Sequence, residues 1–343
     1  MKKARAQNPG SADTSSAWSS PAQRLKAPRT GGPAGRPVFP AFLVLSFLWL
    51  CSCSIQRLAT NKVADMISSS TGGSVFMSDN DPELVADALP FAIKLYESLS
   101  SAIPGHEALR LRAGSLYIMY ANAFLQTSAD MTARQDIETR EHLLARAKNL
   151  YLRGREMLLV ALKKRNPALL DQLKERKYRE ATAPYGQKDV PFLYWTAAGW
   201  LGAFAIDPFD MRLGLTLPQA AALMERVREL APDYGRGAIH VFFISYYGSL
   251  PEYMGGDVKK AREHYEKALA LSGGADISPY VALATTVCVK EQNVGEFQSL
   301  LKKALEFDPD RYPDTRLANI LGQRKARWLL QHTESHFLVD ELR

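Results

Sequence analysis

Residues 137–165 read IETREHLLARAKNLYLRGREMLLVALKKR, and this stretch decides the fold class. Apolar or small residues return every three to four positions, which is the spacing of one face of an α-helix. They are Leu143, Ala147, Leu150, Gly154, Met157 or Leu158, and Ala161. Asn166-Pro167 ends the pattern, because proline disfavours helical geometry in the residue before it. The stretch therefore predicts a long helix that packs on its neighbours through one face.

The same spacing recurs through residues 54–343, where strict two-residue alternation is almost absent. Asp79-Asn80-Asp81-Pro82-Glu83 is typical of a helix start, since acids favour the N-terminus and proline suits the first turn. We expect that helix to run to about residue 101 and the next to span about 106–126. Further helices are expected at 190–205, 217–230, 235–249, 256–272, 278–291, 294–307 and 313–331. Residues 166–189 form a long charged connection, with one short helix expected near 168–176.

Paired helices of this length favour a repeat architecture, and the spacing of several residues matches the tetratricopeptide (TPR) pattern. Matches to its second helix are Ala92, Tyr96, Leu99 and Pro104, then Ala261, Tyr265 and Ala268, then Ala304 and Pro309. Trp195-x2-Ala198-Gly199 has the spacing of the first-helix element. The repeats are degenerate and are interrupted at 206–216 and 250–256. The sequence predicts an all-α protein, a TPR-like α-solenoid of degenerate helical hairpins with no significant β-sheet.

The first 52 residues are typical of an export leader. Residues 1–40 are rich in Pro, Gly, Ser and Arg, and 41–50 form an apolar core too short to span a bilayer. Leu50-Cys51-Ser52-Cys53 resembles the lipobox of bacterial lipoproteins, with Cys53 as the acylated residue; Cys51 as acceptor would place bulky Leu50 at the cleavage position. A buried cysteine pair is the alternative interpretation. We expect a signal segment at 1–52 and a helical domain at 53–343, lipid-anchored on the periplasmic side of a membrane.

Charge and motifs exclude several function classes. The net charge is +7, but the first forty residues carry seven basic residues against the single acid Asp13, which leaves +1 for the remainder. A nucleic-acid partner is therefore not expected. The chain has no phosphate-binding loop, nucleophile elbow or dinucleotide fingerprint, so we expect no enzyme and no cofactor. His332 and His336 could share a metal, but we interpret them as a solvated helix end and expect no metal site. Cys288 reads as a small core residue.

Aromatic clusters are the candidate binding residues. Three groups of aromatic residues recur at helical spacing on the first helices of successive hairpins, the side on which TPR arrays bind partners. From them we predict an apolar cleft for a peptide or a hydrophobic small molecule, lined by Tyr117, Tyr120, Phe124, Trp195, Trp200, Phe242 and Tyr246. Packing between hairpins is the alternative for each residue. The charge run 174–180 is either a solvated surface or a docking patch.

Residues 79–97, DNDPELVADALPFAIKLYE, resemble the N-terminal signature of the TatT component family. These are TPR lipoproteins associated with tripartite ATP-independent periplasmic (TRAP) transporters. The similarity continues through 117–124 and 268–309. The resemblance implies a homotrimer, a cleft or pore in each protomer, and association with the substrate-binding P component, without catalytic residues. A TPR lipoprotein that serves as a scaffold in envelope assembly is the alternative function.

Overall fold

The computed structural model describes residues 62, 65, 75–133 and 135–338. The chain divides into two compact units, Met1–Ser54 and Ile55–Arg343, and every described residue belongs to the second. The predicted leader and Cys53 lie outside the described residues, so the lipidation site stays a prediction.

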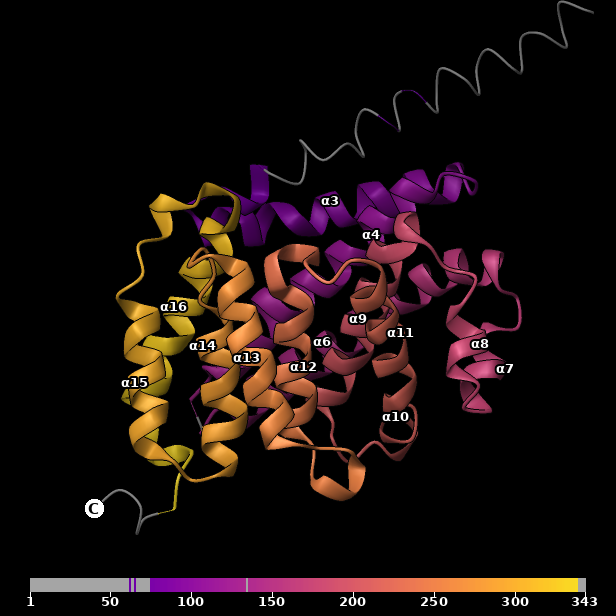
Figure 1. The fold of residues 1–343 in the computed structure, drawn as a ribbon. Helices are drawn as coiled ribbons and strands as arrows, with labels where there is room; N and C mark the ends of the chain where they lie inside the picture. Colours follow the sequence, from indigo (N-terminus) through magenta and orange to yellow (C-terminus); the bar gives the residue numbers. More distant parts are fainter. Residues whose placement is uncertain (1–61, 63–64, 66–74, 134, 339–343) are drawn as a thin grey trace, which may run out of the picture. The chain divides into compact units, whose positions relative to one another are not determined.

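The described part of the chain is a series of helices without a strand, which confirms the all-α prediction (Figure 1). The longer helices are α3 (Pro82–Ala102), α4 (Glu107–Tyr120), α6 (Ile137–Arg165), α9 (Val190–Ile206), α11 (Leu217–Leu230), α12 (Ala238–Ser249), α13 (Val258–Ser272), α14 (Ser278–Leu283), α15 (Val294–Leu305) and α16 (Arg316–Gln331). Short helices between them are α5 (Thr127–Asp130), α7 (Leu169–Lys174), α8 (Tyr178–Thr182) and α10 (Met211–Gly214). None of the described helices is both long enough and apolar enough to cross a bilayer.

Side-chain caps explain where several helices begin. The carboxylate of Asp81 accepts the backbone N–H of Leu84 at the start of α3, and Asp136 accepts that of Thr139 at the start of α6. An aspartate or asparagine at this position satisfies a backbone donor that has no partner inside the helix. Pro82 then fills the first turn of α3, as the sequence predicts.

Four segments depart from the expected bounds. The helices expected at 106–126 and 278–291 each pass into a wider π-helical turn, at Ala121–Gln126 and Ala284–Cys288. The helix expected from 235 begins at Ala238, because Gly235 and Arg236 have positive φ angles of 62° and 52°, which an α-helix does not accept. The connection at 166–189 contains α8 in addition to the expected short helix, α7.

Consecutive helices are packing neighbours through much of the chain. Helix α3 packs on α4, α4 on α6, α6 on α9 and α9 on α11, while α12, α13, α14 and α15 continue the series to α16. The crossing of α4 and α6 is especially close, because a Cβ added to Gly154 would lie 2.6 Å from the carbonyl oxygen of Gly114. Three apolar clusters run through these contacts. The TPR-like geometry of the array stays a prediction.

Helix α16, near the end of the described residues, packs against α3. Arg324 of α16 forms an ion pair with Glu83 of α3, and Arg316 donates to the carbonyl oxygen of Ser78 at 3.0 Å. Leu317 belongs to the same apolar cluster as Val85 and Leu89 of α3. Residues far apart in the sequence thus pack directly against each other.

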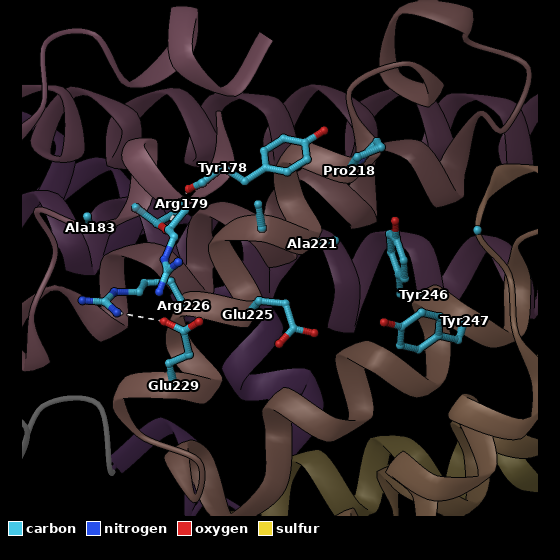
Figure 2. Close-up of a pocket in the computed structure, with 13 residues that line it drawn as sticks. Tyr178, Arg179, Ala183, Pro218, Ala221, Glu225, Arg226, Glu229, Tyr246 and Tyr247 are labelled. Atoms are coloured by element: carbon cyan, nitrogen blue, oxygen red, sulfur yellow. Dashed lines mark hydrogen bonds and ion pairs between the residues drawn. The ribbon is translucent and has the colours of Figure 1, made fainter. Parts of the chain in front are cut away.

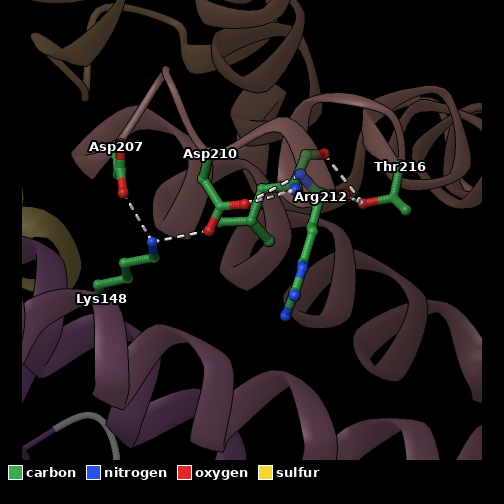
Figure 3. Close-up of polar contacts among 6 residues, drawn as sticks. Lys148, Asp207, Asp210, Arg212 and Thr216 are labelled. Atoms are coloured by element: carbon green, nitrogen blue, oxygen red, sulfur yellow. Dashed lines mark hydrogen bonds and ion pairs between the residues drawn. The ribbon is translucent and has the colours of Figure 1, made fainter.

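The insertion at 206–216 is held to α6 by charge. Lys148 of α6 donates to Asp207 at 2.9 Å and to Asp210 at 2.8 Å (Figure 3). These hydrogen bonds raise the pKa of Lys148, the one to Asp210 most. The other oxygen of Asp210 accepts the N–H groups of Arg212 and Leu213, so a single carboxylate caps α10 and anchors it.

Candidate functional site

A groove of about 800 Å³ lies over α11, between α8 and α12 (Figure 2). Helix α11 supplies the floor, and the two neighbouring helices and the turn at Gly255 supply the walls. Its lining residues are Tyr178, Arg179, Thr182, Ala183, Pro218, Ala221, Ala222, Glu225, Arg226, Glu229, Tyr246, Tyr247 and Gly255. Four different segments of the sequence therefore build one surface.

Polar contacts fix the wall that α8 forms. The side chain of Asn166 donates to the carbonyl oxygen of Ala181 at 3.0 Å, which ties α8 to the end of α6. From the floor, Arg226 donates to the carbonyl oxygen of Tyr185 at 2.8 Å and to Glu229 at 2.8 Å. Because Asn166 holds the backbone of α8 at Ala181 and Arg226 holds the backbone just after it at Tyr185, this wall is preformed.

The opposite wall is aromatic. Phe242 stacks on Tyr246 with 6.1 Å between ring centroids, and Phe243 stacks on Tyr247 at 5.7 Å, so buried rings orient the two tyrosines that reach the groove. Burial, and then the neighbouring hydroxyls of Tyr247 and Tyr178, raise the pKa of Tyr246 to about 12. The phenol is therefore neutral at physiological pH and can donate a hydrogen bond.

Both charge signs line the groove. Arg226 is paired with Glu229, and Glu225 with Arg228 at 2.6 Å. The exposed guanidinium of Arg179 has no ion-pair partner among the described residues. Pro218, Ala221 and Ala222 line the floor with small apolar side chains, which leave it open. Such a surface can bind a polar or amphipathic partner through its tyrosines and Arg179.

The cysteine and the two histidines considered in the sequence, Cys288, His332 and His336, do not line the groove. Across the described ranges, no group of three His, Cys, Asp or Glu side chains is placed to hold a metal ion. His332 stacks on Trp328 at 4.3 Å instead. Cys288 is fully buried, and burial raises the pKa of its thiol to about 12, so it is a core residue as the sequence predicts.

Of the seven aromatic residues predicted from the sequence, Tyr246 lines this groove. Phe242 and Trp200 are buried beside it in the same apolar cluster, and the indole N–H of Trp200 donates to Thr216 at 2.9 Å. Trp195 is partly buried against the same cluster. Tyr117 and Phe124 belong to a separate cluster, around α3 and α4, and Tyr120 packs against both clusters. A binding role for all seven residues, Tyr246 included, stays a prediction.

The groove contains residues outside the seven predicted aromatic positions. Tyr178 and Arg179 belong to the charge run 174–180, for which a docking patch is one of two interpretations, and Tyr247 follows Tyr246 directly. Ala221 and Ala222 carry no signal of their own in the sequence. Their place in the floor depends on how α8 and α12 flank α11.

Comparison with known proteins identifies the family. The model of the TRAP transporter T-component family matches residues 78–337. The chain belongs to this family. It is also 32% identical over 312 residues to an uncharacterized protein of Treponema pallidum (strain Nichols), an alignment that covers 87% of this chain and 97% of that protein. A T component is part of a transport system, so membership assigns the chain a role in TRAP transport and agrees with the resemblance at residues 79–97.

Proposed function

We propose that this T component is a lipid-anchored periplasmic scaffold that docks the substrate-binding P component of its TRAP system in the groove over α11. The observation that carries the proposal is the groove itself, in which three tyrosines and the exposed cation Arg179 surround a floor of small residues. Tyrosine and arginine are the residues that most often dominate protein interfaces.

The character of the groove favours a polypeptide over a small apolar molecule. Its lining is mixed, and two carboxylates, Glu225 and Glu229, face the same space as the tyrosines. A small-molecule site is typically concave and mostly apolar, whereas an interface tolerates a polar, wet rim. A hydrophobic ligand, which the aromatic clusters predict, is the second candidate occupant.

The remaining parts of the proposal come from the sequence and the family. Acylation of Cys53 would hold the protein at the membrane, because two or more acyl chains give stable anchoring. A TPR-like array of hairpins would present the groove, and three protomers would assemble into a homotrimer.

Co-purification tests the proposal. The full chain, solubilised from membranes, should retain a P component from the same genome, and Cys53→Ser should move the protein out of the membrane fraction while Cys51→Ser should not. Arg179→Glu should reduce the retained P component without changing the membrane fraction. Retention of envelope-assembly proteins in place of the P component would support the alternative scaffold function and contradict this one.

A further inference from the structure

The two carboxylates in the floor of the groove are already engaged by arginines of the same helix. Glu229 accepts a hydrogen bond from Arg226 at 2.8 Å, and Glu225 accepts one from Arg228 at 2.6 Å. All four side chains belong to α11, where residues three positions apart are neighbours on the helix surface. Their charges cancel in pairs, so these two ion pairs offer no net charge to a partner that enters the groove.

The α8 wall, in contrast, carries an excess of positive charge. Residues 174–180, KERKYRE, hold four basic and two acidic side chains, a net charge of +2. Arg179 of this run lines the groove, is exposed, and has no ion-pair partner among the described residues. Its side chain extends from α8 toward the pair of Arg226 and Glu229 (Figure 2). An anion that enters the groove would therefore meet a guanidinium whose charge is still available.

The tyrosines of the groove add neutral hydrogen-bond donors. Tyr178, Tyr246 and Tyr247 line the same space as Arg179. Burial raises the pKa of Tyr246 to about 12, and burial also raises the pKa of Tyr247. Both phenols keep their protons at neutral pH, so they can donate to an anion that a phenolate would repel. The groove thus offers donors, while the acceptors of its floor are occupied.

We propose that the groove recognises a carboxylate of its partner, so that an acidic segment of polypeptide lies between α8 and α12 with one carboxylate paired to Arg179. The inference rests on the docking of the P component in the proposed function, and it names the chemistry of the segment that docks. A guanidinium fork matches the two oxygens of a carboxylate. The carboxylate belongs to an aspartate, a glutamate or the C-terminus of the partner chain.

The size and the floor of the groove favour a polypeptide over a free small anion. A carboxylate alone fills a small part of about 800 Å³. The floor presents the small apolar side chains of Pro218, Ala221 and Ala222, which suit the main chain and aliphatic atoms of an extended segment. A segment of this kind covers the floor and brings its charge to the α8 wall.

A charge series at position 179 tests the proposal, by calorimetric titration of the P component into the detergent-solubilised full chain. Arg179→Lys keeps the charge and should weaken binding by less than about fivefold, whereas Arg179→Gln should weaken it by about tenfold or more. Raising NaCl from about 50 to 500 mM should weaken wild-type binding more than Arg179→Gln binding, because salt screens the lost charge. Arg212→Gln, at an exposed cation outside the groove, is the matched control and should bind like wild type.

Carbodiimide crosslinking identifies the partner group. This reagent joins an amine to a carboxylate in contact with it, as an amide without a spacer. Arg179→Lys places an amine on the α8 wall and should crosslink to the P component. Mass spectrometry of the joined peptides should map the amide to an aspartate, a glutamate or the C-terminal residue, which distinguishes the sources. Arg212→Lys should give no crosslink through its introduced lysine.

The outcomes separate this inference from the proposed function. Equal binding by wild type and Arg179→Gln, with no crosslink through Arg179→Lys, overturns the acidic segment. Weak binding by Ala222→Trp in the same assay would then leave docking in the groove standing, whereas wild-type affinity in that variant would contradict docking as well. A P component that does not bind the wild-type chain contradicts both.

Discussion

At the residue scale, a buried pair of histidines predicts how stability depends on pH. Nδ1 of His240 lies 2.7 Å from Nδ1 of His264, and the rings of Phe243 and Tyr247 pack beside them. Burial, with Lys267 and Arg228 as further causes, lowers the pKa of His240 to about 4, and burial likewise lowers that of His264 to about 4. At neutral pH one ring donates its proton to the other.

Both histidines therefore bind protons more weakly in the folded state than in the unfolded state, where the pKa is near 6.5. Stability should be full above pH 6.5 and should fall as the pH drops toward 4, by about 1.4 kcal/mol per pH unit for each histidine that titrates. Urea unfolding at pH 7 and pH 4.5 measures the difference. A His240→Gln/His264→Gln variant should lose much of this slope, and an unchanged slope would contradict the pair's role.

Single residues also show where sequence reasoning ends. Cys288 could be predicted as core because it sits in an apolar run without a partner. Whether Trp195 and Trp200 face the core or the solvent could not be predicted, because α9 is apolar on every side and its spacing marks no single buried face. Tyr246 could be proposed for the groove, but Arg179 joins it only through the position of α8.

At the element scale, the crossing of α4 and α6 predicts a steric limit. A Cβ at Gly154 would lie 2.6 Å from the Gly114 carbonyl oxygen and 2.7 Å from the side chain of Ile118. Gly154→Ala should therefore force the two helices apart and lower the free energy of unfolding by about 1–3 kcal/mol, despite the better helix propensity of alanine. Gly105→Ala, with no atom within 4 Å of the added Cβ, should change stability by less than about 0.5 kcal/mol. Equal effects in chemical denaturation would contradict the close crossing.

The bounds of α6 could be predicted to the residue, because its stripe is regular and Asn166-Pro167 stops it. The start of α12 could not, since it depends on positive φ angles at Gly235 and Arg236. Helix α8 has five residues, too few for a periodic signal, and its place depends on hydrogen bonds to other elements. Local signals thus predict the long helices, whereas tertiary contacts decide the place of the short helix α8, which forms one wall of the groove.

At the scale of the whole molecule, the family could be predicted from the sequence, but the packing between helices that are distant in the sequence could not. Residues 79–97 carry a motif that points to T components, and the family model agrees. The contact of α16 with α3 joins residues about 240 positions apart, as in the pair Glu83–Arg324. Helical periodicity describes only neighbours within one helix, so it does not predict such a contact. The groove over α11 depends on the same kind of long-range placement.

Calorimetric titration of the P component into the purified full chain tests the central claim most directly. Ala222→Trp should fill the floor of the groove, and Arg179→Glu should reverse the charge of an exposed cation in its wall. Each should weaken binding by at least tenfold, or about 1.4 kcal/mol, while Arg212→Glu, an exposed cation outside the groove, should stay within twofold of wild type. Wild-type affinity in folded Ala222→Trp and Arg179→Glu variants would contradict docking of the P component in this groove.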